Sequence, residues 1–261
     1  MVAAPRIVFS ESAAGVYPIN VDAVLLGGFL RTLEAPKARS HAVDLGCGTG
    51  VVGLQLLATC GFERVTFVDV HAGSIETAQT NAASSGVSER ATFHLGDART
   101  FAEAARGTAN LVAINPPYFE EHTITPSPSA DRNRAIAGSL GRFLQASRQL
   151  LGRAGRVALA YPAPRLDALI VEAVRAGLAP KVLRFVHARA CEPARLVLAS
   201  LAAGKVGGTS VQAPLFEWEP RGGDEKVRPQ MTREYAALLS DWRALIGAPE
   251  FGEAPAGALP D

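Results

Sequence analysis

Val43-Asp44-Leu45-Gly46-Cys47-Gly48-Thr49-Gly50 is the stretch of this chain that decides its fold. It continues a short apolar run and leads into apolar residues at helical spacing between Val51 and Leu57. A strand that passes through a glycine loop into a helix is the first unit of an α/β fold with a parallel sheet. The glycines also allow a ligand to come close to the backbone. We therefore expect a ligand site at this loop.

Outward from the loop, helix and strand patterns alternate in both directions. Helices are expected near residues 20–34, 50–60, 72–85, 98–106, 139–152, 164–177 and 232–246, with Asn20 as the N-cap of the first. Strands are expected near residues 41–45, 65–70, 91–95, 109–114, 155–161, 181–188 and 194–202, and a further short strand at 213–218. The strands at 181–188 and 194–202 have no helix-length connection, so they should be antiparallel. The sequence predicts an α/β, Rossmann-like, mostly parallel seven-stranded sheet with a reversed last strand.

The loop also satisfies the Gly-x-Gly-x-x-Gly pattern from Gly48 to Gly53, with Asp69 placed 21 residues after Gly48. That pattern is typical of a dinucleotide-binding dehydrogenase. Asp44, however, stands just before the glycines, where its charge would oppose a pyrophosphate at the helix N-terminus. S-adenosylmethionine has no phosphate and carries a sulfonium and an amino group. A carboxylate at this place therefore favours S-adenosylmethionine.

Polar side chains stand at the ends of four successive predicted strands. After Asp44, Asp69 ends the second strand, where it could accept hydrogen bonds from both hydroxyls of a ribose. Asp97 follows the third strand and could accept from the exocyclic amine of an adenine. Each acid could instead cap the helix that follows it. Because Asn115 occupies the fourth strand end, we expect one ligand site rather than four separate caps.

Asn115-Pro116-Pro117-Tyr118-Phe119 follows the apolar run from Ala109 to Ile114 and so lies at the end of a buried strand. The Asn115 side-chain oxygen and the Pro116 carbonyl could accept the two hydrogens of a planar NH2 group. The Tyr118 ring, with Phe119 beside it, could stack on the conjugated system that carries the nitrogen. A proline-rich turn without a ligand is the alternative for an isolated motif. The neighbouring acids favour a clamp for an amine.

With these motifs the chain resembles a class I S-adenosylmethionine-dependent methyltransferase of the Asn-Pro-Pro-Tyr amino-methylating group. Within that group it is most similar to the bacterial valine-tRNA adenine-N6 methyltransferases and their relatives. The resemblance covers about residues 7–240. It also rests on three segments outside the loop and the clamp, namely Tyr17 to Leu26, Leu183 to His187 and Pro193 to Leu198. The family usually has an Ala-Arg followed by a His or Glu after the clamp, and residues 132–138 lack that acid or imidazole.

The resemblance and the residues together predict the site and the division of the chain. We expect residues 1–19 to be an N-terminal extension, 20–203 the methyltransferase domain, 204–247 a C-terminal addition packed on that domain, and 248–261 a disordered tail. The predicted catalytic residues are Asn115, Pro116 and Tyr118. The predicted S-adenosylmethionine-binding residues are Asp44, Gly46, Gly48, Gly50, Asp69, Asp97 and Asn115. The expected acceptor is the exocyclic amine of a nucleic-acid base, adenine N6 in a tRNA loop.

Three other functions stay open at this point. One is a non-catalytic adaptor that retains the fold, against which the intact clamp and acids argue. The same clamp serves enzymes that methylate a glutamine side-chain amide of a protein. A nicotinamide-dependent oxidoreductase belongs to another enzyme class; Asp44 argues against it, and the sequence has no evident catalytic Tyr/Lys or His/Asp arrangement for it.

Charge is unevenly distributed, although the net charge is only +1. Residues 131–200 carry 12 Lys and Arg against 4 Asp and Glu, a balance of +8, whereas residues 1–130 carry 8 against 12. A basic region that begins just after the clamp suits a phosphate-bearing substrate. We therefore expect this region to contact tRNA. The polar, proline-containing segment 120–139 is expected to form a lid over the target site.

Composition excludes several other classes. The 261 residues, 48% of them hydrophobic, suffice for one large α/β domain. Cys47, Cys60 and Cys191 are far apart and form no cluster with His, so neither a metal site nor a disulfide is expected, and Cys47 should be a small loop filler. No run of 18 apolar residues occurs, so we expect no membrane contact and a cytoplasmic protein.

Overall fold

The computed structural model describes residues 7–8, 20–33, 39–116, 140–220 and 230–246. The helices in these ranges are α1 Val21–Thr32, α2 Val51–Thr59, α3 Ala72–Ser84, α4 Ala98–Ala104, α6 Leu140–Leu150, α7 Leu166–Arg175 and α8 Arg233–Ile246, with 3-10 turns η1 Ser88–Arg90 and η2 Ala163–Arg165. The strands are β1 His41–Leu45, β2 Arg64–Asp69, β3 Ala91–Leu95, β4 Ala109–Ile114, β5 Leu151–Pro162, β6 Leu178–His187, β7 Ala194–Ala203, β8 Ser210–Val211 and β9 Leu215–Phe216.

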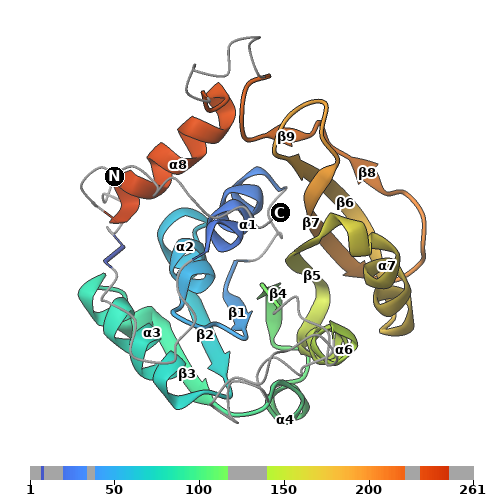
Figure 1. The fold of residues 1–261 in the computed structure, drawn as a ribbon. Coiled ribbons are helices and arrows are strands. Elements are labelled where there is room, and N and C mark those ends of the chain that lie inside the picture. The colour runs from blue at the N-terminus through green and yellow to red at the C-terminus, as the bar shows by residue number, and fades with distance from the viewer. Residues whose placement is uncertain (1–6, 9–19, 34–38, 117–139, 221–229, 247–261) are drawn as a thin grey trace, which may run out of the picture.

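One sheet runs through the described residues in the order β3-β2-β1-β4-β5-β7-β6-β8, with β9 also paired to β6 (Figure 1). The strands from β3 to β5 pair in parallel. Strand β7 is antiparallel to both β5 and β6, while β8 and β9 run parallel to β6. The expected mostly parallel α/β sheet with a reversed β7 is confirmed.

Helices cover both faces of the sheet. Successive strand residues point to opposite faces, so strands that are apolar throughout need cover on each side. In β4, Leu111 and Ala113 join the apolar cluster that contains residues of α1, α2 and α3. Val112 and Ile114 join the other cluster, which contains residues of α4, α6 and α7. Figure 1 shows these two sets of helices on opposite sides of the sheet. The two apolar layers leave the ends of the strands as the place for polar chemistry.

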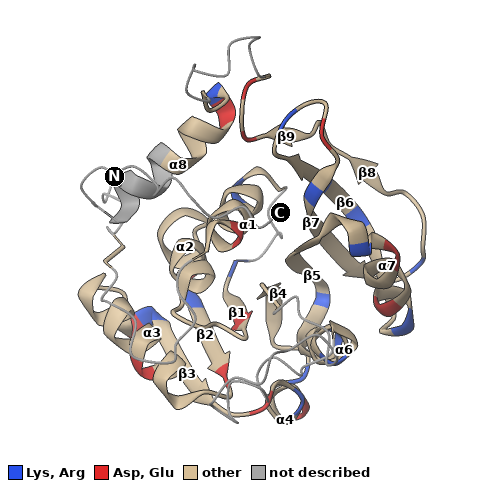
Figure 2. Cartoon of the chain, in the orientation of Figure 1, with Lys and Arg blue, Asp and Glu red and all other residues tan. Residues whose placement is uncertain are grey.

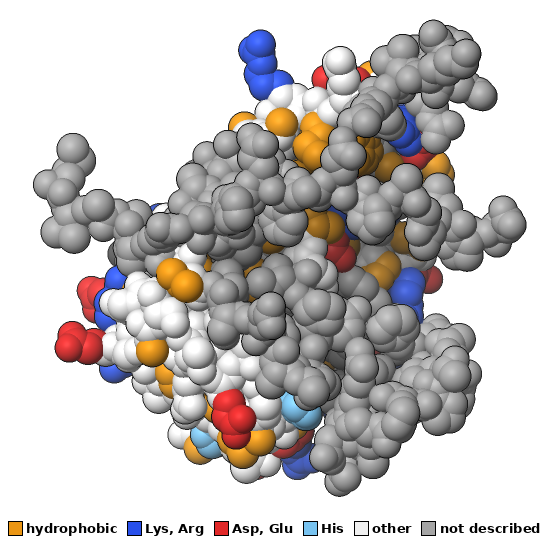
Figure 3. All heavy atoms as spheres, turned by 60° about the vertical axis from the view of Figure 1, so that its left-hand side comes forward, with side chains coloured by type: hydrophobic (Ala, Val, Ile, Leu, Met, Phe, Trp, Pro, Cys, Tyr) orange, Lys and Arg blue, Asp and Glu red, His pale blue; other side chains and the backbone are white. Residues whose placement is uncertain are grey.

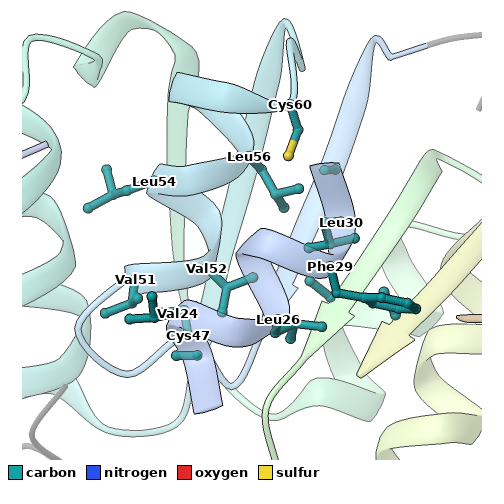
Figure 4. Packing of buried hydrophobic residues seen from close by; sticks show 14 of the residues in the cluster. Val24, Leu26, Phe29, Leu30, Cys47, Val51, Val52, Leu54, Leu56 and Cys60 are labelled. Atoms are coloured by element: carbon teal, nitrogen blue, oxygen red, sulfur yellow. The ribbon is translucent and has the colours of Figure 1, made fainter. Parts of the chain in front are cut away.

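Helix α1 lies across α2 and the strands β5 and β7. Its N-cap is Asn20, as expected, and the Asn20 side chain accepts a hydrogen bond from the Ala23 N–H. Figure 4 shows how the apolar side chains of α1 and α2 interdigitate, with Val24 close to Val51 and Val52. Each such buried side chain stabilises the fold by about 1.5–3 kcal/mol. This packing fixes where the start of α1 lies relative to the glycine loop.

Helix α8 closes the outer side of α1, where Gly28 lets the two helices come together. A Cβ at Gly28 would lie 2.9 Å from Leu238 Cδ1, closer than side chains tolerate. The buried Tyr235 of α8 belongs to the same apolar cluster as α1. Residues 204–220 and 230–246 thus contribute β8, β9 and α8 to the same body as the long strands. The exact domain boundaries stay a prediction.

The sequence predicted the long elements well and the last short strands poorly. Strand β5 begins at Leu151 and β6 at Leu178, earlier than expected. Instead of one strand at 213–218, two strands of two residues form, β8 and β9, so the described part of the chain contributes nine strands to the sheet rather than the expected seven. Pro214 lies between them and has no N–H to donate to β6, which interrupts the ladder.

Several predicted features fall on other parts of the chain. The expected lid at 120–139 and the tail at 248–261 lie outside the described residues. Of the expected extension 1–19, Ile7 and Val8 are described; Ile7 is buried in the core, and the Val8 N–H donates to Ser85 Oγ over 2.9 Å. In the described ranges, no helix is long and apolar enough to cross a bilayer.

Candidate active site

The sheet brings the predicted polar residues to one edge. Because β3, β2, β1 and β4 are adjacent and parallel, their carboxyl ends lie side by side. Along that edge the order is Asp97, Asp69, Asp44 and Asn115. Figure 2 shows acidic positions in β1 and at the end of β2. This is the edge at which open α/β sheets bind their ligands.

The glycine loop begins this edge between β1 and α2. Gly46, Gly48 and Gly50 have φ values of 77°, 52° and 83°, a conformation that favours glycine. The N–H groups of Gly46 and Cys47 donate to the Val68 carbonyl over 2.8 and 3.0 Å, which fastens the loop to β2. A Cβ at Gly48 would meet no atom within 4 Å among the described residues. The loop therefore offers open space at Gly48.

Asp44 lies beneath the loop and is only 2% exposed. Its Oδ2 accepts a hydrogen bond from the Gly53 N–H over 2.8 Å, which joins β1 to the first turn of α2. Burial raises the pKa of Asp44 to about 7; the Gly53 N–H opposes this rise and the nearby Asp69 adds to it. A cation close to this buried group would favour its ionised form, and an anion there would oppose it.

Asp69 joins the end of β2 to the glycine loop. Its Oδ2 accepts from the Gly48 N–H and its Oδ1 from the His71 N–H, each over 2.9 Å. Burial raises the pKa of Asp69, and these two N–H groups oppose the rise. A carboxylate oxygen has two acceptor positions, so both oxygens can accept a further hydrogen bond. Two ribose hydroxyls would suit this arrangement.

Asp97 is exposed and caps α4, one of the two roles that the sequence left open. Its Oδ1 accepts from the N–H groups of Arg99 and Thr100 over 2.9 and 3.3 Å. The preceding Gly96 N–H donates to the Asp69 carbonyl over 2.9 Å, which holds the end of β3 against β2. The capping role is observed, and the contact to an adenine stays a prediction.

Asn115 and Pro116 follow β4 directly. Asn115 is half-buried, and its Nδ2 donates to Asn20 Oδ1 over 3.3 Å. Pro116 is buried. The other predicted members of the clamp, Pro117, Tyr118 and Phe119, lie outside the described residues. The structure therefore places Asn115 beside the start of α1, and the clamp as a whole stays a prediction.

Sequence reasoning missed an ion cluster beside this end of β4. Arg195, at the start of β7, donates through Nη1 to Asp22 Oδ1 and through Nε to Glu217 Oε1, each over 2.9 Å. Asp22 belongs to the first turn of α1, and Glu217 follows β9. Asp22 and Arg195 belong to two of the segments that carry the resemblance, but no sequence pattern pairs residues 173 positions apart.

Cys47 fills space inside the loop. It is 8% exposed, and burial raises the pKa of its thiol further above its ordinary range. A protonated, buried thiol is a poor nucleophile. Among the described residues, no group of three or more His, Cys, Asp or Glu could hold a metal ion.

The basic excess of residues 131–200 is spread over several elements. Figure 2 shows blue positions on α6, α7 and the strands β5 to β7. Among the described residues, ion pairs with carboxylates are formed by Arg175, Arg184, Arg189 and Arg195. On the face shown in Figure 3, charged side chains of both signs are dispersed over the described part of the surface. Contact of this region with a nucleic acid stays a prediction.

Comparison with known proteins gives one family and several relatives. A model of the family described as Methyltransferase small domain matches residues 22–158. The chain is similar to the tRNA1(Val) (adenine(37)-N6)-methyltransferase of Porphyromonas gingivalis, with 31% identity over 159 residues that cover 58% of this chain and 61% of that protein. A second match, 40% identical over 81 residues, covers 30% of this chain and 28% of the release factor glutamine methyltransferase of Chlorobaculum tepidum.

Solved structures extend the likeness over more of the chain. A predicted O-methyltransferase from Agrobacterium tumefaciens matches with a TM-score of 0.62 and 19% identity, covering 84% of this chain and 95% of that one. At this identity the match shows the fold, and it confirms the predicted Rossmann-like class. The matched region spans 61% of the length of the Porphyromonas gingivalis protein and 66% of the length of the relative of the same name from Glaesserella parasuis.

Proposed function

The chain belongs to the methyltransferase small domain family, and from that premise we propose that it transfers a methyl group from S-adenosylmethionine to the exocyclic amine of a nucleic-acid base, adenine N6 in a tRNA loop. The expectations of a methyltransferase and of S-adenosylmethionine as its cofactor are confirmed at the level of family and fold. The acceptor, the site residues and the activity of the whole protein are proposals.

One observation carries the proposal: two carboxylates, not cations, stand beside the glycine loop. Asp44 lies under the loop, and Asp69 accepts from the Gly48 N–H. Two acids at this place favour a ligand with positive charge near the loop and ribose hydroxyls beside it. A pyrophosphate would meet negative charge here, which argues against the nicotinamide-dependent oxidoreductase.

The glycine loop and the acids at the ends of β1, β2 and β3 form the cofactor half of the sheet edge. Their chemistry fits S-adenosylmethionine. Asp69 would hold the ribose hydroxyls, Asp97 the adenine amine, and the open space at Gly48 would let the ligand lie against the backbone. Asp44, with its pKa near 7, would be ionised more readily once a cation lies close to it. When bound, the cofactor supplies an electrophilic methyl carbon on a sulfonium.

The residues that follow β4, from Asn115 to Tyr118, form the acceptor half of the edge. They would act on the amine by geometry and electrostatics. Asn115 Oδ1 and the Pro116 carbonyl would accept the two N–H hydrogens, which directs the nitrogen lone pair at the methyl carbon. The new N–C bond forms as the S–C bond breaks, and the surplus proton leaves the nitrogen, now cationic and acidic, to water. No strong base is needed beforehand. Tyr118 would hold the flat base by stacking.

Two lines of support favour a tRNA acceptor. Relatives named as tRNA adenine-N6 methyltransferases match across more than half of this chain, whereas the relative named as a glutamine methyltransferase matches 30% of it. The excess of Arg and Lys in residues 131–200 also suits a polyanion. Methylation of a protein glutamine amide is the second candidate, because its planar NH2 group fits the same pair of acceptors.

A methyl-acceptor assay tests the proposal. The purified protein is given labelled S-adenosylmethionine with bulk tRNA, rRNA or release factors, and RNA nucleosides are analysed for N6-methyladenosine. We expect label in tRNA as N6-methyladenosine. Label confined to the release factor would establish the second candidate instead. Titration with NAD and with S-adenosylmethionine checks the cofactor, and binding of NAD alone would contradict the proposal.

Asn115→Ala tests the clamp within the same assay. Loss of one positioned partner of the reacting group is expected to lower kcat by about 10² to 10³, while the variant still folds and binds S-adenosylmethionine. Asn110→Ala is the matched control, because Asn110 lies at the opposite end of β4 and bonds to Ser40 and His41. Equal turnover of the two variants would remove Asn115 from the reaction.

A further inference from the structure

We propose that Asn20 is a positioning residue that fixes which way the Asn115 amide points, an inference that rests on the proposed function of Asn115. The two side chains are 95 positions apart in the sequence and meet where α1 begins and β4 ends. Asn20 thus has two partners, one in its own helix and one beside the reacting amine.

The first step is the orientation of Asn20 itself. Its Oδ1 accepts the Ala23 N–H over 2.9 Å as the N-cap of α1. A backbone N–H can only donate, so the Asn20 atom that faces it must be the oxygen. The helix cap therefore decides which end of the Asn20 amide is which, a choice that is otherwise ambiguous for asparagine.

The second step carries this orientation to Asn115. The Asn115 atom that lies 3.3 Å from Asn20 Oδ1 must be a donor, and hence Nδ2. The opposite orientation would place two amide oxygens against each other. Asn115 Oδ1 is therefore held on the side of the amide away from Asn20. An oxygen, rather than an NH2 group, is what an amine donor requires.

The start of α1 is itself held in place by charged groups from distant strands. Asp22, two residues after the cap, pairs with Arg195 of β7, which also pairs with Glu217. The side chains of Asp22 and Glu217 are 13% and 9% exposed, so these two carboxylates are largely shielded from water, while Arg195 is partly exposed. Desolvation would lower the pKa of Arg195, but the two carboxylates outweigh it and raise that pKa. The cap that orients Asn115 is thus anchored to the sheet.

Three substitutions separate capping from positioning. Asn20→Ser keeps a capping oxygen for the Ala23 N–H but is too short to reach Asn115. Asn20→Asp keeps an oxygen for both partners and is the conservative rescue. Asn20→Ala removes both contacts. Each variant is made alone and together with Asn115→Ala, and kcat, KM for the acceptor, the S-adenosylmethionine dissociation constant and Tm are measured.

We expect Asn20→Ser to lower kcat about tenfold with unchanged Tm, because the Asn115 amide loses one of the contacts that hold its orientation and spends less time in the reactive one. Asn20→Asp should restore kcat. In the Asn115→Ala background, Asn20→Ser should have no further effect. In an NMR spectrum, the Asn115 side-chain NH2 resonances should lose their hydrogen-bonded shift in Asn20→Ser and keep a hydrogen-bonded shift in Asn20→Asp.

The outcomes distinguish this inference from the function on which it rests. If Asn115→Ala loses turnover but Asn20→Ser keeps it, positioning by Asn20 is wrong and the clamp stands. If Asn115→Ala turns over normally, the proposed function of Asn115 fails first. A loss in Asn20→Ser that persists in the Asn115→Ala background would mean that Asn20 acts through another residue, and would overturn the inference.

Discussion

The two halves of the sheet edge are built by contacts of different range. In the cofactor half, Asp44 bonds to Gly53 nine residues later, and Asp69 to Gly48 and His71 within 21 positions. In the acceptor half, Asn115 bonds to Asn20 across 95 positions, and the neighbouring cluster joins Arg195 to Asp22 across 173.

The difference shows which contacts determine the geometry of each half. The cofactor half depends on glycine dihedrals and on carboxylates that bond to nearby backbone N–H groups, so a short stretch of chain specifies it. The acceptor half depends on the tertiary fold, because Asn115 contacts the start of α1, and α1 is in turn paired with β7. Substitutions in the two halves should therefore affect different quantities.

Asp69→Ala is expected to have the largest effect on cofactor affinity and tests the cofactor half. It removes a charged acceptor for two ribose hydroxyls, and two such hydrogen bonds correspond to a rise of about 10² in the S-adenosylmethionine dissociation constant. Asp69→Asn keeps one oxygen, so its dissociation constant should lie between those of the wild type and Asp69→Ala. Calorimetric titration measures both. Wild-type affinity in Asp69→Ala would take this residue out of the cofactor site.

Gly50→Ala and Gly48→Ala form a pair that separates folding from binding in the same loop. At Gly50 a Cβ would lie 3.2 Å from Ala78 Cβ with φ at 83°, so we expect a loss of about 2 kcal/mol in unfolding free energy. At Gly48 no described atom lies within 4 Å of a Cβ, and the loss should be about 1 kcal/mol.

The same pair reports where the ligand lies. Gly48→Ala should weaken S-adenosylmethionine binding about tenfold, roughly 1.4 kcal/mol, because its methyl group would enter the space proposed for the cofactor. Denaturant unfolding and calorimetry measure the two quantities. If Gly48→Ala binds like the wild type, the ligand does not lie against that glycine.

Arg195→Met tests the long-range half. Asp22 and Glu217 would lose their shared partner while remaining shielded from water. We therefore expect the free energy of unfolding to fall by about 1–2 kcal/mol. This is less than for a fully buried pair, because Arg195 is partly exposed. Arg175→Met is the control, since Arg175 pairs with Glu172 at an exposed i,i+3 position and should cost under about 0.5 kcal/mol. Equal stability of the two variants would make the Arg195 cluster dispensable.

The same division explains what could be predicted from the sequence. Glycine spacing, strand alternation and acids at strand ends are local signals, and they gave β1 to β4 nearly to the residue. The Asn20–Asn115 contact carries no such signal, because Asn20 is fully accounted for as a helix cap. Nor does Arg195 differ in sequence from the other arginines of its region. Only the crossing of α1 over β5 and β7 brings these residues together.

Asp97→Ser is expected to have the smallest effect, and it decides between two roles of one side chain. Serine keeps an oxygen for the N–H groups of Arg99 and Thr100, so α4 stays capped and Tm should not change. If Asp97 also accepts from the adenine amine, the dissociation constant of S-adenosylmethionine should rise about fivefold, the size of one hydrogen bond. Asp97→Ala should show that rise together with a stability loss of about 1 kcal/mol. Unchanged affinity in Asp97→Ser would mean that Asp97 acts only as a helix cap. The cofactor half would then bind S-adenosylmethionine through Asp69 and the glycine loop, without a contribution from the end of β3.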